Sequence, residues 1–160
     1  MQKIAPFLWF EDKAEEAANF YVSIFKNSKI KEVARYDEES AAVSGRPVGS
    51  VMVVSFEIEG QEFNALNGGP EFSFSPAISF YIKCDTQEEI DHFWSKFSEG
   101  GKIMACGWIT DKFGVTWQVS TPMLDKMLQD KDPAKARRVM KAMLGMEKID
   151  IEGLKKAYNQ

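Results

Sequence analysis

The sequence predicts an α+β fold of two tandem β-α-β-β-β units followed by a helical C-terminal extension. Strand-like segments alternate with amphipathic helical ones, the same motifs recur in order in both halves, and the last segment has helical patterning only. We expect a two-unit domain over residues 1–122, with repeat one at 3–68 and repeat two at 76–121. The helical extension then covers 123–160.

In the first half, a helical pattern opens at Asp12 and carries apolar residues at helical spacing to Phe25. A Glu59-Gly60 turn joins the last two strand-like segments into a hairpin. Residues 37–47 are polar and small and contain Gly and Pro, so we expect a mobile loop there. The strand-like segments are 3–10, 29–36, 50–58 and 61–67.

In the second half, a helix is expected to begin at Thr86 or Asp85 and to stop at Gly100-Gly101. Short strand-like segments surround it, at 77–83, 103–109, 110–112 and 115–121. In the extension, Asp132 before Pro133 is typical of a helix start, and we expect a helix from Pro133 to Leu144. Asp150 is expected to cap a last helix over residues 151–158.

The two halves align as an internal repeat. The alignment that places Asp12 on Asp85 also places Phe20-Tyr21 on Phe93-Trp94. Further along, a smaller offset places Gly60 on Gly114 and Asn64 on Gln118. The second copy is therefore shorter, and the whole loss lies between its second and third strands. Several matches in the same order indicate duplication of one supersecondary unit.

Composition excludes several classes of protein. The chain has 160 residues, 44% of them hydrophobic and 28% charged, which is typical of a globular domain. A net charge of −4 speaks against nucleic-acid or membrane-surface binding. No apolar stretch reaches the roughly 18 residues of a membrane span. Two cysteines and no signal-peptide pattern predict a cytoplasmic protein.

Seven segments together resemble the PhnB-like family, whose members often carry the label 3-demethylubiquinone-9 3-methyltransferase. The family is part of the vicinal oxygen chelate superfamily, with glyoxalase I, extradiol dioxygenases and bleomycin-resistance proteins. The resemblance covers essentially the whole chain and implies two half-barrel units. The segments are Pro6–Phe10, Ala14–Ala17, Asn19–Tyr21, Asn67–Pro70, Cys106–Trp108, Asp111–Gln118 and Asp132–Ala136.

The resemblance also implies four positions at which metal-dependent relatives place His and Glu ligands. Here these positions hold Pro6, Asn64, Ser79 and Gln118. Neutral amides and a hydroxyl are poor ligands for a divalent ion, and we expect the single histidine, His92, to pack in or on its helix. No metal and no cofactor are therefore expected. No G-x-G-x-x-G motif opens a helix for a nucleotide-like methyl donor, so the sequence does not support the methyltransferase label.

Six residues are candidates for ligand binding. Asn64 and Gln118 are equivalent amides within apolar strands, and an amide can orient a polar ligand through both its donors and its acceptor. The alternative is a structural amide satisfied by backbone or water. Ser79 adds a hydroxyl group, and aromatic residues supply an apolar lining or simply fill the core. The aromatic candidates are Trp9, Trp108 and Trp117.

Two residues are candidates for catalysis. Asp111 would serve as a general base, or else as a turn aspartate bonded to its own backbone. Cys106 would be a nucleophile, although no histidine partner is evident, and core packing is the alternative.

The sequence leaves three functions open. The first is a small-molecule-binding protein, with a metal-independent enzyme of unknown substrate as one form. The second is a non-catalytic ligand-sequestering protein of the resistance type. The third is a regulatory or interaction protein that acts through its helical tail. A homodimer is expected, because half-barrel units leave open sheet edges and an apolar concave face.

Overall fold

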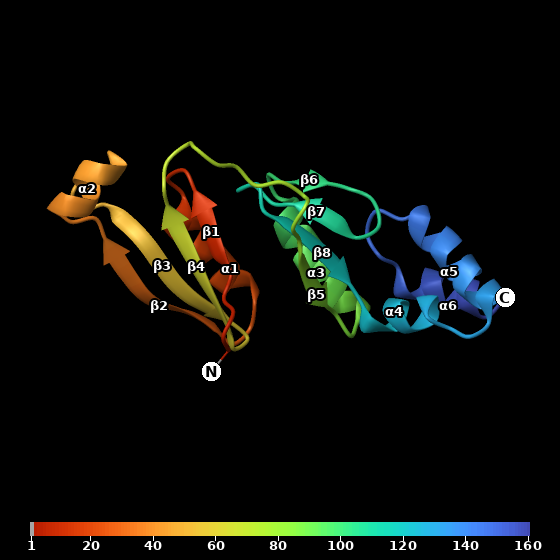
Figure 1. Cartoon of the computed structure of the whole chain (residues 1–160). Coiled ribbons are helices and arrows are strands. Elements are labelled where there is room, and N and C mark those ends of the chain that lie inside the picture. The colour runs from red at the N-terminus through yellow and green to blue at the C-terminus, as the bar shows by residue number, and fades with distance from the viewer. Residues whose placement is uncertain (1) are drawn as a thin grey trace. The chain divides into compact units, whose positions relative to one another are not determined.

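The computed structural model describes residues 2–160, which divide into two compact units. The first unit ends at Phe74 and the second covers Ser75–Gln160. Each contains one four-stranded sheet (Figure 1). Within residues 2–160, no helix has both the length and the apolar character needed to cross a bilayer.

The first unit has the strand order β1-β4-β3-β2, with β1 parallel to β4 and the other neighbours antiparallel. Helix α1 packs on β3 and β4, where Tyr21 stacks on Phe56 with ring centroids 6.1 Å apart. Both rings are fully buried. The elements are β1 (Phe7–Phe10), α1 (Ala14–Ile24), β2 (Ser28–Arg35), α2 (Glu38–Ser44), β3 (Val51–Ile58) and β4 (Gln61–Asn67).

The second unit repeats this topology with the order β5-β8-β7-β6, and β5 is parallel to β8. Helix α3 packs on β7 and β8, where Phe97 stacks on Trp117 at 4.8 Å. The predicted pair of β-α-β-β-β units is confirmed. The elements are β5 (Phe80–Lys83), α3 (Gln87–Ser98), β6 (Lys102–Ile103), β7 (Trp108–Thr110), β8 (Thr116–Ser120), α4 (Pro122–Leu128), α5 (Pro133–Leu144) and α6 (Ile151–Tyr158).

The first strands of the two units do not follow the predicted repeat alignment. Asn64 of β4 lies opposite Phe7 of β1, whereas its counterpart Gln118 of β8 lies opposite Tyr81 of β5. The alignment that matches Asp12 with Asp85 would instead place Phe80 opposite Gln118. The same alignment does hold for the buried faces of helices α1 and α3. The connection from β5 to α3 is therefore shorter by one residue. The predicted equivalence of Pro6 and Ser79 is wrong by that one residue.

Helix α1 receives its N-terminal cap from a distant strand. The expected start at Asp12 is wrong, since the helix begins at Ala14 and the N-cap residue Lys13 makes no side-chain cap bond. Instead, Oδ1 of the buried Asn67 accepts a 2.8 Å hydrogen bond from the Ala14 backbone N–H. An end of β4 thus fixes the start of the helix that covers the same sheet.

The predicted loop at residues 37–47 contains a short helix. Asp37 and Ser40 form a capping box at the start of α2, with the Ser40 N–H donating to Asp37 Oδ1 at 2.8 Å. Gly45 ends the helix with a φ of 73°. The pattern Asp-x-x-Ser was the available signal, and reciprocal capping satisfies two backbone N–H groups at the start of the helix.

The C-terminal extension belongs to the compact second unit. Within it, α4 packs against α5, and α5 packs against α6. The expected bounds of α5 and α6 are confirmed. Asp150 is the N-cap residue of α6, as expected, but its side chain makes no cap bond. Gln87 of α3 provides the cap bond: Gln87 Oε1 accepts from the Ile151 N–H at 2.9 Å.

Candidate functional site

The face of the second sheet opposite α3, called here the open face, carries most of the predicted ligand-binding residues. Neighbouring residues of a strand point to opposite faces, and Trp117 and Val119 of β8 are buried. Gln118, between them, is half-buried on the other face. Strand register places it opposite Tyr81 on one side and Trp108 on the other. Three strands thus bring a phenol, an amide and an indole into one row.

Ser79 joins this row through a hydrogen bond. The Gln118 Nε2 group donates to Ser79 Oγ at 2.9 Å. Within residues 2–160, the Gln118 Oε1 and Trp108 Nε1 atoms make no hydrogen bond. Both residues are half-buried, and neither atom is shut away from solvent. An acceptor and a donor therefore remain available on neighbouring strands, beside an aromatic ring.

Tyr81 is held at the edge of the open face by α4 and the residue before it. Its hydroxyl group donates to Asp125 Oδ2 at 2.9 Å and lies 3.4 Å from the Thr121 carbonyl oxygen. Burial raises the pKa of Tyr81 above its ordinary value, and the Asp125 carboxylate adds to the rise. The phenol therefore stays neutral and fixed near pH 7, as a positioned hydrogen-bonding group rather than a base.

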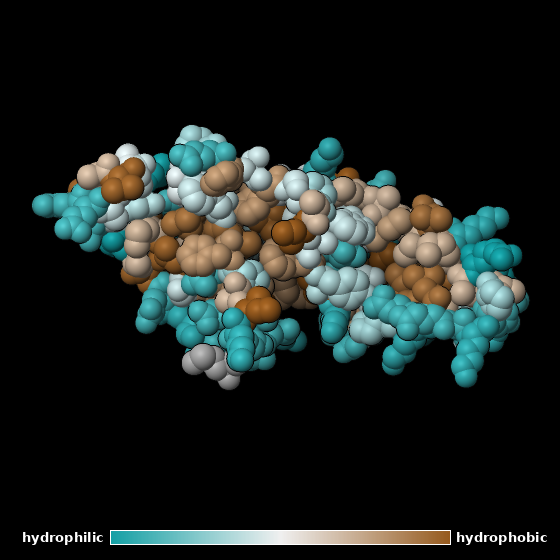
Figure 2. Space-filling view, viewed as in Figure 1, coloured by the Kyte–Doolittle hydropathy of each residue, from teal (hydrophilic) through white to brown (hydrophobic). Residues whose placement is uncertain are grey.

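The first unit has an equivalent open face of more apolar character. Asn64 accepts a 2.8 Å hydrogen bond from Ser55 Oγ, so each sheet carries one amide–hydroxyl pair on this face. Phe7 is 59% exposed beside it, and Trp9 uses its N–H on the Gly69 carbonyl oxygen at 2.9 Å. Apolar surface gathers over the strands of this unit in Figure 2. Asn64 and Gln118 thus hold matching strand positions, each in its own unit.

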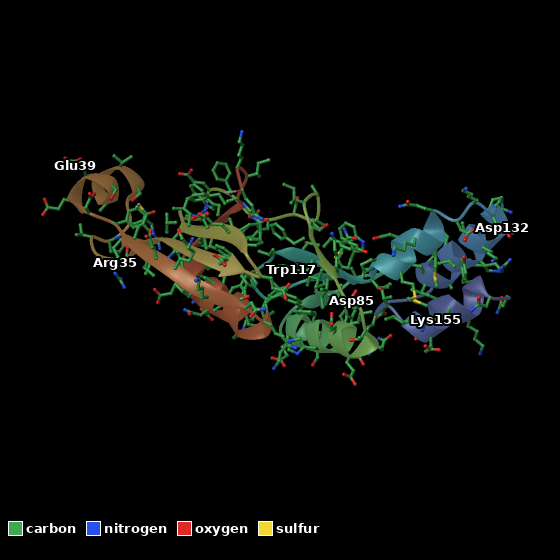
Figure 3. All side chains as sticks on the ribbon, turned by 90° about the horizontal axis from the view of Figure 1, so that it is seen from below. Arg35, Glu39, Asp85, Trp117, Asp132 and Lys155 are labelled. Carbon is green, nitrogen blue, oxygen red and sulfur yellow. The ribbon has the colours of Figure 1, made fainter. Side chains whose placement is uncertain are left out.

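Trp117 does not share the open face. It is 2% exposed, stacks on Phe97 of α3, and donates its indole N–H to Asp111 Oδ2 at 2.9 Å. Figure 3 labels it on β8, beside α3. Of the two readings of Trp117, core packing therefore holds and a place beside Gln118 at a ligand site does not, because adjacent residues of a strand face opposite ways.

Asp111 is committed to structure on the helix side of the same sheet. It is 3% exposed, and Oδ1 accepts the backbone N–H groups of Phe113 and Val115 at 2.8 and 3.0 Å. With the bond from Trp117, both carboxylate oxygens are used. This arrangement is the turn aspartate considered as the alternative to a general base.

Cys106 and Cys84 are both reduced thiols rather than disulfide partners. Cys84 is fully buried, whereas Cys106 is half-buried in the turn before β7 and has a φ of 60°. His92 is exposed on α3, away from the open face, and packs edge-on to Phe93. Cys106 precedes β7 and is not part of the row of residues on the open face.

The four positions at which the resemblance implied metal ligands carry unsuitable donors. Asn64 and Ser55 bond to each other, as Gln118 and Ser79 do. Pro6 contributes only its carbonyl oxygen, which accepts the Asn64 N–H at 2.9 Å. Across residues 2–160, no three His, Cys, Asp or Glu side chains lie close enough to hold an ion. These residues do not fit a divalent transition metal.

Sequence reasoning missed three residues of these faces: Tyr81, Asp125 and Ser55. Tyr81 looks like one more apolar strand residue until the register with Gln118 is known. Asp125 lies on α4, a helix that the sequence did not reveal. The Thr121-Pro122 pair was its available signal, since a threonine cap before a proline is typical of a helix start.

The chain is similar to one protein family in sequence and to several solved structures in fold. The sequence profile of the family described as 3-demethylubiquinone-9 3-methyltransferase matches residues 2–120. A PhnB protein from Bacillus cereus is 40% identical, with a TM-score of 0.67 over 75% of this chain and 99% of that one. Protein PA1353 from Pseudomonas aeruginosa is 19% identical with a TM-score of 0.58, covering 73% and 95%, which shows the fold alone. None of the curated proteins compared with the chain matches it.

Proposed function

The chain belongs to the PhnB-like family of glyoxalase-fold proteins, described as 3-demethylubiquinone-9 3-methyltransferase, and from that premise we propose that it binds a small molecule on the open face of its second sheet. The ligand we infer is planar and carries both a hydrogen-bond donor and an acceptor. It would lie at the edge of the Trp108 ring, accept from Trp108 Nε1 and donate to Gln118 Oε1. The hydroxyl groups of Ser79 and Tyr81 border it.

One observation carries this proposal: a free indole N–H and a free amide oxygen lie on paired strand positions. Half-buried polar groups of this kind cost free energy unless a ligand or water satisfies them. The neighbouring hydrogen bond from Gln118 to Ser79 fixes the amide orientation, so its oxygen is presented in one direction. Preorganised polar groups beside an aromatic surface are typical of small-molecule sites.

The family description names a methyl transfer, and this is not part of the proposal. The β1–α1 turn at residues 11–13 and the β5–α3 turn at 84–86 contain no glycine. Gly68 and Gly69 follow β4, and Gly100 and Gly101 precede β6. A nucleotide-like donor is usually held by a glycine-rich turn that opens a helix.

The two reduced cysteines fit a reducing compartment, and we propose the cytoplasm as the location.

The test is a titration followed by nuclear magnetic resonance, with a panel of phenols and small carbonyl compounds as probes. A binding compound should shift the Trp108 indole N–H and the Gln118 side-chain amide resonances. Trp108→Phe and Gln118→Leu should each weaken binding about tenfold, the effect of one lost hydrogen bond to a desolvated ligand. Gln61→Leu is the matched control, because within residues 2–160 the Gln61 side chain bonds only to the neighbouring Glu62 carbonyl oxygen.

Binding that survives both open-face variants would contradict the site. Turnover of the bound compound separates an enzyme from a sequestering protein. The tail-mediated interaction protein stays the third alternative, although Val139, Ile149 and Leu154 of the tail are already fully buried within their own unit.

A further inference from the structure

We propose that residues 146–151, called here the C-terminal strap, position the open face and so set its affinity for ligand. The inference rests on the proposed function, because it concerns the conformation of the same site. It goes further by assigning a role to the connection between α5 and α6, which is hydrogen-bonded to the turn that precedes Trp108.

The strap holds the turn in front of Trp108 through two backbone hydrogen bonds. The Cys106 N–H donates to the Met146 carbonyl oxygen at 2.9 Å, and the Gly107 N–H donates to the Glu147 carbonyl oxygen at 2.7 Å. The turn itself closes with the Trp108 N–H on the Ala105 carbonyl oxygen at 3.1 Å. The strap therefore contacts the two central residues of the turn that places the indole.

This turn needs outside support. Its central residues Cys106 and Gly107 both have positive φ, 60° and 82°, the pattern of a type I′ turn. Asn or Gly is preferred at the first of these positions, and a non-glycine residue there costs about 1 kcal/mol. The second position must be glycine, because a Cβ there would lie 2.7 Å from the Val119 carbonyl oxygen. Two bonds from the strap offset the strain at Cys106.

The turn also reaches the strand of Gln118. The Gly107 carbonyl oxygen accepts the Val119 N–H at 2.7 Å, one residue beyond Gln118. The strap side chain Ile149 is fully buried and packs against Gly107. A shift of the strap would therefore move both the indole donor and the amide acceptor of the open face.

Gln87 of α3 fixes the strap itself. Its Nε2 donates to the Ile149 carbonyl oxygen at 3.0 Å, and its Oε1 accepts the Ile151 N–H at 2.9 Å. Beside it, Lys148 Nζ lies 2.8 Å from Asp91 Oδ1. Gln87 does not touch the open face, so it is a positioning residue that acts through the strap.

The variant Gln87→Leu tests this without any ligand. Loss of the two amide bonds to the strap should speed the labelling of Cys106 by a thiol reagent about tenfold, and should shift the Trp108 indole N–H resonance. Gln87→Glu, which can still accept from Ile151, should give an intermediate rate. Cys84 is the internal control: being fully buried in the same unit, it is labelled only when that unit unfolds. Gln61→Leu is the matched amide control.

An unchanged Cys106 rate, an equal rise at Cys84, or an unmoved Trp108 resonance would each overturn the inference. A compound that binds in the titration above should bind about tenfold more weakly to Gln87→Leu than to the wild-type protein. Because coupling between two sites is reciprocal, the same compound should slow Cys106 labelling in the wild-type protein. Binding that is equally tight in both proteins also overturns it. Failure to find any binding compound counts against the proposed function alone, since labelling and the resonance still report on the strap.

Discussion

Individual residues of this chain take their roles from strand register more than from residue type. Trp108 and Trp117 are both strand tryptophans, and sequence reasoning considered both for a ligand site, with core packing as the alternative. The structure separates them, because Trp117 alternates with Gln118 while Trp108 pairs with it. Period-two alternation was visible in the sequence, but which phase faces the helix depends on α3 packing, through the contact with Phe97.

The first prediction concerns Asp111. Asp111→Ala should destabilise the second unit by about 3 kcal/mol, because it leaves the buried Trp117 indole N–H and two backbone N–H groups without an acceptor. Urea unfolding measures this loss. Asp12→Ala, at an exposed aspartate, is the control and should change stability by less than about 0.5 kcal/mol. A loss below about 1 kcal/mol for Asp111→Ala would contradict the structural role.

At the scale of elements, most helices and strands follow from pattern, and the exceptions have physical reasons. Helices with an apolar stripe and a clear stop were found within a few residues, as for α3 and α5. Helix α2 was missed because its order comes from a capping box rather than from a buried stripe, with only Ala41 buried. The cap of α1 was missed because Asn67 lies far away in sequence.

Asn67 provides a second prediction. Asn67→Ala should cost about 2 kcal/mol, because the Ala14 N–H loses its acceptor and the Val51 carbonyl oxygen loses the donor that lies 3.2 Å away. Thermal unfolding followed by helix circular dichroism measures it. Asn19→Ala is the matched control on the exposed side of α1, where the amide bonds only to Glu15. Equal effects of the two changes would argue against the distant cap.

Docking of the strap predicts a pH dependence. The hydrogen bond from Lys148, followed by that from Gln87, lowers the pKa of Asp91 below its ordinary value. A carboxyl group with a lowered folded-state pKa adds stability above its unfolded-state value, about 4, and loses it as the pH falls through the folded-state value. The stability difference between wild type and Asp91→Asn should therefore be largest above about pH 5 and shrink toward about pH 3.

This difference should stay below about 1 kcal/mol, because both side chains of the pair are exposed and solvent screens them. Thermal unfolding of the two proteins across this pH range measures it, in about 0.1 M salt. Added salt should reduce it further, since the interaction is between exposed charges. A difference that does not change with pH would mean that the ion pair does not contribute.

At the scale of the whole molecule, the homodimer stays a prediction. Phe7 is 59% exposed on β1, an edge strand of the first sheet, and the chain has a mass of 18.1 kDa. We expect light scattering at micromolar concentration to give twice that mass, with a total interface above about 1,000 Å². Phe7→Asp should shift the equilibrium toward one chain, whereas Val43→Asp on the 92% exposed side chain of α2 should not. A wild-type protein with the mass of a single chain would contradict it.

The duplicated architecture could be predicted from the sequence, because each unit repeats its helix, turn and strand motifs in order. The use of the architecture could not, since the four positions considered for metal ligands hold a proline, two amides and a hydroxyl group. Each sheet has one amide–hydroxyl pair, and the hydroxyl group comes from β3 in the first unit but from before β5 in the second. That exchange depends on register and side-chain reach, which pattern alone does not specify.

Helix α2 lies in the segment where the two units differ most in length. Next to it, hydrogen bonds hold together the ends of strands β2 and β3. The Tyr36 N–H bonds to Ser50, the Gly49 N–H returns to Tyr36, and the Tyr36 hydroxyl group bonds to the Asn67 carbonyl oxygen. Arg35 and Glu39 lie on either side of this junction (Figure 3). Strands β2 and β3 are thus joined without help from the helix, and the second unit makes the same connection with only residues 104–107. The excursion is therefore a natural graft point, where an epitope or reporter peptide could replace residues 38–48 and leave both sheets as they are.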